Sequence, residues 1–330
     1  MNRKTGVLFG LGVFFVVLAA VLQFYAGPRL VKIPLAVDKE SVSEAKGATF
    51  LFVDDSVPGS PKISIRTGED LVATRKIRSD VKASSDDRVV FDQFQRVEDT
   101  KGELVSAATD RVALDRHSAA AVACCNEAVD SKAVKHKGLS YTFPLGTAKT
   151  NYQFFDTVAR APFEMRYQGD ETIDGLEVYK FEQNIFEQTT EQGREVPGSL
   201  VGQPDELTVK ADMVYSNVRT VWVEPTTGSI IRGQEKQHRV LRAPGGADTT
   251  VLDADFTFTP KTVAANVKDA EDKKSQLTLI SSVVPPIALG LGVLLVIIGL
   301  VVALTSSGRD GEGTRRAGHR PSDEAEPALT

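Results

Sequence analysis

The residues of this chain best suited to chemistry are two adjacent cysteines with a histidine on either side. Cys124 and Cys125 are the only cysteines, and His117 and His136 flank them. These four side chains could bind zinc. However, zinc sites usually space paired cysteines by two or more residues, so adjacent cysteines are awkward ligands for one ion. We therefore expect no metal and no cofactor.

The cysteine pair leaves three alternatives open. Neighbouring Cα atoms are about 3.8 Å apart, which is below the usual range for a disulfide, so a bond between Cys124 and Cys125 would close a strained ring. The two could also be free, partly buried thiols, or they could form bonds to another chain. We expect them to lie outside the cytoplasm, where thiols tend to oxidise.

No catalytic motif accompanies these residues. The sequence contains no zinc-hydrolase helix, phosphate-binding loop, Gly-rich dinucleotide turn or Gly-x-Ser-x-Gly elbow. Its many acidic residues form no recognisable acid–base arrangement, and a solvated surface explains them. The net charge of −5 excludes a broadly basic nucleic-acid binder. We expect no catalytic residue, no enzymatic activity and no nucleic-acid partner.

Aromatic side chains recur on segments that resemble strands. An ordinary hydrophobic core is the simplest explanation, and the alternative is the lining of an apolar cavity that holds a lipid. We expect that cavity between the sheet and the helix that follows it. The candidates for its lining are Phe154, Phe163, Met165, Tyr167, Tyr179, Phe181, Tyr215 and Trp222.

The elements that must position these residues are mainly strands. Alternating apolar and polar residues indicate strands at 48–53, 62–66, 71–81, 88–97, 103–114, 163–168, 176–182, 214–223, 229–241 and 249–259. A helix is expected over 261–280, because Thr259-Pro260 caps its start and proline is favoured in the first turn of a helix. The predicted fold class is α+β: a large curved antiparallel sheet with a closing C-terminal helix.

Each end of the chain carries an apolar run. Residues 5–28 and 275–308 contain no charged side chain, and a helix of roughly 20 apolar residues spans a bilayer. The alternative for the first run is a cleaved signal peptide, although its apolar region exceeds the usual length. The spacings Gly6–Gly10 and Ala288–Gly292 suit close helix packing, but glycine is common in membrane helices.

These runs predict a two-pass protein of the cell membrane with both termini in the cytoplasm. Flanking charges are nearly balanced, and long loops translocate largely regardless of charge. The expected organisation is a cytoplasmic N-terminus (1–5), a membrane helix (6–27), an extracytoplasmic α+β domain (28–278), a second membrane helix (279–304) and a disordered cytoplasmic tail (305–330).

Eight short segments together resemble one known family. They are DRVALDR (110–116), CC (124–125), GLSYTFPLG (138–146), YQFFD (152–156), MRY (165–167), GLEVYKF (175–181), VPGSL (196–200) and VWVEPTTG (221–228). The chain is similar to the actinobacterial porin PorA family, a domain of unknown function, over nearly its whole length except the tail. One branch, the LmcA-like two-pass membrane proteins, is associated with lipoglycan assembly in the cell envelope. The resemblance implies a StARkin-like helix-grip fold, a curved sheet that grips a helix. It implies no catalytic residue.

The family name suggests a porin, but the sequence opposes that interpretation. A membrane barrel needs many amphipathic strands with a lipid-facing apolar band, whereas two apolar helices already anchor this chain. The favoured hypothesis is a lipid-binding protein whose partner is a membrane lipid or lipid-linked glycan. The alternative is a non-enzymatic scaffold for a membrane protein partner, an enzyme of envelope assembly.

Overall fold

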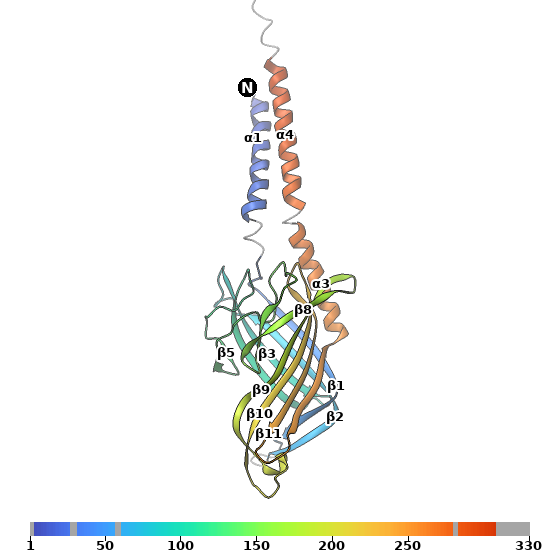
Figure 1. The fold of residues 1–330 in the computed structure, drawn as a ribbon. Coiled ribbons are helices and arrows are strands. Elements are labelled where there is room, and N and C mark those ends of the chain that lie inside the picture. Colours follow the sequence, from blue (N-terminus) through green and yellow to red (C-terminus); the bar gives the residue numbers. More distant parts are fainter. Residues whose placement is uncertain (1–2, 27–31, 57–60, 280–282, 308–330) are drawn as a thin grey trace, which may run out of the picture. The chain divides into compact units, whose positions relative to one another are not determined.

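The computed structural model describes residues 3–26, 32–56, 61–279 and 283–307 (Figure 1). The chain divides into two compact units. One unit holds the helices from both ends of the chain, and the other, Val31–Leu277, holds the sheet and one further helix. The expected disordered tail, 305–330, lies almost entirely outside the described residues.

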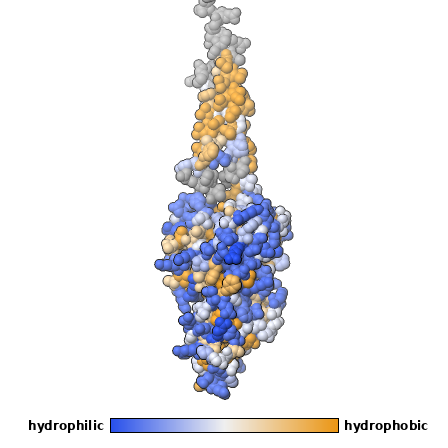
Figure 2. Space-filling model, in the orientation of Figure 1, coloured by the Kyte–Doolittle hydropathy of each residue, from blue (hydrophilic) through white to orange (hydrophobic). Residues whose placement is uncertain are grey.

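Two apolar helices form the first unit, as the sequence predicts. They are α1 (Arg3–Val21), which continues into a short π-helical turn η1 (Leu22–Ala26), and α4 (Val284–Ser307). Their apolar spans are 20 and 21 residues long, which is enough to cross a bilayer. Many of their large apolar side chains are exposed, so the helix surfaces are hydrophobic (Figure 2). Such a surface suits lipid.

Glycines let α1 and α4 approach each other closely. A Cβ atom added to Gly12 would lie 2.7 Å from Cγ2 of Val296, and one added to Gly292 would lie 2.8 Å from Cγ2 of Val16. Gly10, by contrast, has no such neighbour within 4 Å. Of the glycines in the two expected spacings, Gly292 on α4 lies at the helix contact and Gly10 on α1 does not. The glycine of α1 at the contact is Gly12.

The second unit contains one sheet of twelve antiparallel strands. The strands are β1 (Asp38–Asp54), β2 (Lys62–Ser79), β3 (Arg88–Asp99), β4 (Leu104–Asp115), β5 (Ala128–Val129), β6 (Lys132–Ala133), β7 (Tyr152–Asp156), β8 (Ala161–Ile173), β9 (Leu176–Val196), β10 (Val209–Glu224), β11 (Ser229–Arg242) and β12 (Thr249–Phe258). A 3₁₀ turn, η2 (Gly198–Val201), precedes β10. The α+β class and the large curved sheet are confirmed.

The sheet is built from two meanders that meet in its middle. The strand order is β6-β5-β4-β3-β2-β1-β12-β11-β10-β9-β8-β7, so only the β1–β12 pair joins strands distant in sequence. Ser43 lies opposite Phe258 in that pair. The sequence predicted a curved antiparallel sheet of mostly shorter strands, and it gave no sign of this central pairing.

At one end of the sheet, the segment between β4 and β7 connects these two strands, which belong to different meanders. Leu114 of β4 pairs with Ala121, Ala120 pairs with Leu139, and Leu139 pairs with Phe154 of β7. The link needs Gly138, whose φ is +77° and where a Cβ would overlap the backbone of Gln153. The curled sheet is therefore closed into a ring at this end by backbone hydrogen bonds.

The concave side of the curl is filled at the closed end. One apolar cluster there draws Phe91 from β3, Leu114 from β4, Phe154 from β7, Phe181 from β9 and Val223 from β10. Strands so far apart in the sheet can share one cluster only because the sheet curls around it. This face is called the inward face below, and the opposite face is the outward face.

The helix α3 (Pro260–Thr278) packs on the outward face. Its buried residues Val267 and Ala270 join Trp222 of β10 in a separate apolar cluster, and strand alternation points Trp222 away from Val221 and Val223. Asn266 donates to the carbonyl of Ile231 over 3.0 Å. The helix lies beside the curled sheet (Figure 1). The sequence predicted a closing helix over 261–280, and the structure shows α3 packed against β10 and β11.

We expect Gly12→Ile to separate α1 from α4, because a larger side chain would overlap Val296. The readout is oxidative crosslinking of Phe9→Cys with Gly299→Cys, since Gly299 lies close to Phe9. After proteolysis between the helices, the crosslink holds the two end fragments together on a non-reducing gel. Gly12→Ile should reduce this product to background, whereas the matched control Gly10→Ile should preserve it. Equal yields from the two variants would contradict the packing.

Candidate functional site

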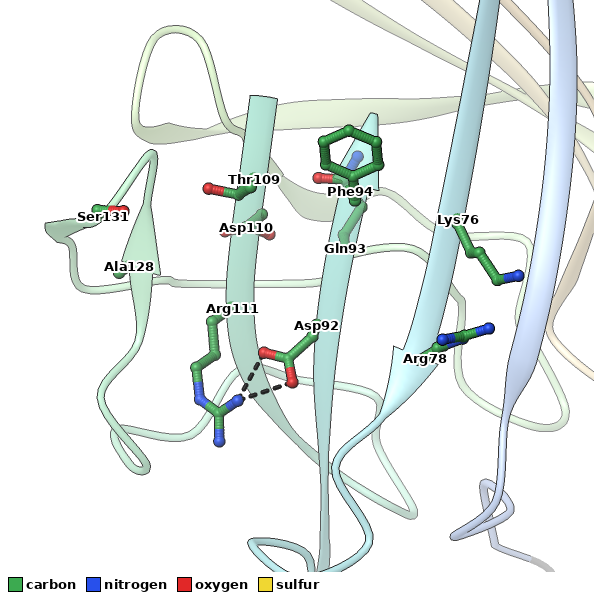
Figure 3. A pocket seen from close by; sticks show the side chains of 10 residues that line it. All are labelled: Lys76, Arg78, Asp92, Gln93, Phe94, Thr109, Asp110, Arg111, Ala128 and Ser131. Carbon is green, nitrogen blue, oxygen red and sulfur yellow. Dashed lines mark hydrogen bonds and ion pairs between the residues drawn. The ribbon is translucent and has the colours of Figure 1, made fainter. Parts of the chain in front are cut away.

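A groove of about 560 Å³ lies on the outward face of β2, β3 and β4, next to β5 (Figure 3). Directly opposed residues of antiparallel strands share a face. By this register Lys76, Phe94 and Thr109 form one row across the three strands. The row places a cation, an aromatic ring and a hydroxyl side by side.

A second row lies two residues further along the strands. Arg78 lies opposite Asp92, Asp92 lies opposite Arg111, and Arg111 lies opposite Ala128 of β5. The Arg111 guanidinium donates to both carboxylate oxygens of Asp92, over 2.6 and 2.8 Å (Figure 3). Successive residues on one face of a strand are about 7 Å apart, so the two rows fit a single small ligand.

The cations of the groove differ in their availability. Arg111 also donates to Asp80 over 2.8 Å, and this hydrogen bond, with the one to Asp92, raises the pKa of Arg111. Its role is to hold the groove together. Arg78 donates from Nε to Asp38 and keeps 61% of its side chain exposed. Lys76 approaches Asp38 only at 3.8 Å. Lys76 and Arg78 can therefore bind a ligand.

Phe94 is the unusual apolar residue of the groove. Its side chain is 47% exposed, although a ring on a strand normally packs into a core. An exposed ring beside cations and a hydroxyl offers a flat apolar surface with polar edges. Such surfaces are typical of binding sites for ligands that are partly apolar.

The cysteine pair lies next to this groove. Cys124 and Cys125 are joined by a disulfide, and the carbonyl of Cys125 accepts a 2.8 Å hydrogen bond from Nε of Arg111. His117 is exposed, whereas His136 is buried with other partners. Among the described residues no group of three or more His, Cys, Asp or Glu side chains could hold a metal.

Beneath the groove, His136 lies buried between two carboxylates. Its Nε2 is 2.8 Å from Asp110, and its Nδ1 is 3.0 Å from Glu127. Burial alone would lower the pKa of His136, but the hydrogen bonds and charges of Asp110 and then Glu127 outweigh burial and raise it above 6.5. Tyr141 donates to Asp110. Because Glu127 and His136 belong to the segment that closes the ring, this cluster fastens that segment to β4.

A larger polar cluster lies on the inward face. The guanidinium of Arg219 on β10 donates to Asp156 over 2.9 Å and to Gln183 over 2.8 Å, and it lies 3.2 Å from Glu235 of β11. Burial would raise the pKa of Glu235, but Arg219 and then Arg75 lower it to about 2. Glu235 is therefore ionised at neutral pH, and its negative charge offsets that of the buried arginine.

Seven of the eight residues expected to line a lipid cavity share the inward face. Met165, Phe154 and Phe181 lie in the apolar cluster at the closed end, and Tyr167 and Tyr179 pack against it. Phe163 lies opposite Phe154, and Tyr215 donates to Asp156 in the polar cluster. Trp222 alone faces α3.

The inward aromatic rings pack on one another. The Tyr167 and Phe181 ring centroids are 5.8 Å apart, and Phe143, which the sequence did not single out, lies 4.8 Å from Phe181. These are ordinary core contacts. The role of these rings in binding lipid stays a prediction.

Sequence reasoning missed the groove residues altogether. Lys76, Phe94 and Arg111 come from three separate strands, and no local motif connects them. The one available signal was Phe94, which occupies a position between Asp92 and Arg96 where strand alternation predicts a polar side chain. The exposed position of Phe94 points to a site only when the register of β3 with β2 and β4 is known.

We expect stability to depend on pH through His136. Its folded pKa is raised, so the stabilisation is fully present below pH 6.5 and is lost as pH rises through the folded pKa. His136→Gln should lower the free energy of unfolding by about 1–3 kcal/mol below pH 6.5 and should remove this loss at higher pH. Thermal unfolding of the full chain across that range measures both effects. The control is His238→Gln, since His238 is 47% exposed. A pH dependence that persists in His136→Gln would contradict the assignment.

We expect Arg219→Met to destabilise the fold strongly, because it leaves Asp156 and Glu235 buried without their cation. Breaking a buried ion pair in this way costs about 3–5 kcal/mol. The matched control is Arg194→Met, which breaks an ion pair with Glu191 whose side chains are about half exposed. Urea unfolding of the full chain in detergent compares the two variants, and equal losses would contradict a structural role for Arg219.

Comparison with known proteins identifies relatives that match most of the chain. The family model described as Porin PorA matches residues 5–301. A protein named Porin PorA from Corynebacterium amycolatum is 27% identical, and the match covers 72% of this chain and 77% of the relative. Another Porin PorA, from Corynebacterium resistens, is 24% identical and covers 89% of this chain and 94% of the relative. This chain belongs to the Porin PorA family.

Proposed function

We propose that this chain is a membrane-anchored, non-catalytic binding protein of the cell envelope. Its ligand is the phosphorylated sugar or polyol head group of a membrane lipid or lipid-linked glycan. The groove on β2, β3 and β4 binds that head group. Both termini lie in the cytoplasm, and residues from about 28 to 278 lie outside it.

The observation that carries the proposal is the row of Lys76, Phe94 and Thr109 beside Arg78. Two available cations suit a phosphate or another anion, because charge-assisted hydrogen bonds are the strong ones. An exposed ring suits the apolar C–H face of a sugar, and the Thr109 hydroxyl can bond a sugar hydroxyl. The volume of about 560 Å³ fits a head group, since small-molecule sites span roughly 300–1,000 Å³.

The two apolar helices support the membrane anchor. Their spans are 20 and 21 residues long, and α1 packs against α4 through Gly12 and Gly292. A pair of helices that crosses the membrane and returns would place both termini on one side. The segment between them would then lie on the opposite side, where envelope lipids and glycans are assembled.

The relatives carry the name porin, but the outward face of this sheet does not suit a lipid-facing barrel wall. Lys76, Arg78, Asp92 and Arg111 all point outward from three neighbouring strands. The visible surface of the sheet unit is largely hydrophilic (Figure 2). A membrane barrel instead needs an apolar outward band with charges kept from the bilayer centre. Binding at the groove accounts for these charges.

The packing of the inward aromatic residues favours head-group recognition over enclosure of acyl chains. Phe181 and Met165 are completely buried, and an acyl chain could enter only if the core rings separated. The groove requires no such rearrangement, because its cations and its ring are already exposed. The lipid-binding hypothesis is therefore narrowed to the polar end of the lipid.

The test is titration of the full chain in detergent with soluble inositol 1-phosphate and, in parallel, with phosphatidylinositol micelles. Lys76→Gln combined with Arg78→Gln should weaken binding of both probes at least about tenfold, as expected for the loss of charged hydrogen bonds. Phe94→Ala should weaken binding of inositol 1-phosphate but should leave the weak binding of inorganic phosphate unchanged.

The matched control is Lys236→Gln, which removes an exposed cation of β11 that is not part of the groove. It should bind both probes as the native chain does. If phosphatidylinositol binds and inositol 1-phosphate does not, the chain recognises the acyl part of the lipid and not its head group. Equal affinities of the double variant and the control would contradict the proposal and favour the scaffold interpretation.

A further inference from the structure

The disulfide segment forms part of the structural support of the groove. Cys124 and Cys125 are each partly exposed, and Ala128, three residues later, lines the groove opposite Arg111. A small thiol in solution can therefore reach the disulfide without unfolding of the sheet.

The backbone at this segment adopts an uncommon conformation. The φ angles of Cys125 and Asn126 are +66° and +60°, which is the left-handed region that residues other than glycine avoid. Two such residues in succession form a tight turn, in which Asn126 is readily tolerated and Cys125 is the uncommon residue. The ring formed by the two cysteines is one constraint, and the hydrogen bond from Arg111 to the Cys125 carbonyl is another.

That hydrogen bond connects the disulfide to the ligand-binding row. The same guanidinium donates to Asp92 within the groove and to Asp80 at its border. If the Cys125 carbonyl turns away, Arg111 loses one of its three hydrogen-bond partners. The guanidinium and Asp92 can then shift together, and Asp92 lies directly opposite Arg78.

We propose that Cys124–Cys125 is a site of thiol–disulfide exchange with a dithiol, and that its redox state sets the geometry of the groove. The disulfide form holds Arg111 in place. The dithiol form releases the left-handed backbone and the Cys125 carbonyl, and it binds the head group more weakly. The effect on ligand affinity rests on the proposed function, whereas the effect on the backbone does not.

The exchange follows ordinary disulfide chemistry. One thiolate of the dithiol attacks the Sγ of one cysteine, and the bond between Cys124 and Cys125 breaks. The other cysteine leaves as a thiolate and takes up a proton. The second thiolate of the dithiol then displaces the bound cysteine. The dithiol ends as a disulfide with two electrons removed, and both cysteines end as thiols.

The test is hydrogen exchange of the full chain in detergent before and after treatment with dithiothreitol. Alkylation and mass measurement confirm that two thiols have formed. Reduction should increase exchange in peptides covering 109–113 and 122–130 and should leave β10 and β11 unchanged. Reoxidation should restore protection. Unchanged exchange after complete reduction would overturn the inference.

A second readout is the affinity for inositol 1-phosphate. Reduction should weaken it about fivefold, because the hydrogen bond that is lost positions the groove and does not contact the ligand. Cys124→Ala with Cys125→Ala should behave as the reduced chain does. Arg111→Lys, which removes the Nε donor, should make affinity insensitive to reduction. Equal affinity of the reduced and oxidised chains would also overturn the inference. If the oxidised chain does not bind inositol 1-phosphate, the proposed function fails. The hydrogen-exchange data alone then test whether the redox state of the disulfide controls the backbone.

Discussion

The sheet unit depends most on the hydrogen bonds and ion pairs of one buried guanidinium, that of Arg219. A curled sheet places the side chains of many strands on one shared inward face, and here that face includes charged residues as well as rings. Burying an arginine costs several kcal/mol unless its charge is neutralised and its donors are satisfied. Asp156, Gln183 and Glu235 meet both requirements, so three separate segments of the chain are held at fixed positions around one side chain.

The same cluster connects the two meanders. Arg75 of β2 lies 3.6 Å from Glu235 of β11 and donates to Gln95 of β3. The inward face therefore has an apolar cluster at the closed end and a polar layer next to it, and both are occupied by the protein's own side chains. A site for an external ligand is then expected on the outward face, where the groove between β2 and β5 lies. Protein interiors are close-packed in general, and the buried rings of this inward face contact one another in that manner.

Much of the fold could be predicted from the sequence because its signals are local. The apolar helices follow from uncharged runs, most strands from alternation, and α3 from its capping proline. The run Val221-Trp222-Val223 is apolar on both faces of its strand, which indicates that something covers each side. It does not indicate against which face of the sheet α3 packs. That choice depends on the pairing of β1 with β12 and on the outward position of Trp222, which are properties of the whole sheet.

The candidate site could not be predicted for the same reason. Lys76, Phe94 and Arg111 become neighbours only through strand register, and each is unremarkable within its own segment. The aromatic residues were conspicuous in the sequence because they are numerous, yet numerous rings are the ordinary content of a core. Local pattern thus identified the residues that fill the protein, whereas the residues that can bind a ligand emerged from the cross-strand geometry of its outward face.

The most direct test of this account is to locate a bound lipid covalently. Phosphatidylinositol with a photoactivatable group on its head group would be irradiated with the full chain, and the attachment sites would be mapped by mass spectrometry. Attachment is expected at Phe94 and its neighbours on β2, β3 and β4. Attachment at Phe154, Phe181 or other inward rings would contradict this expectation, because the ligand would then occupy the space that the folded core fills.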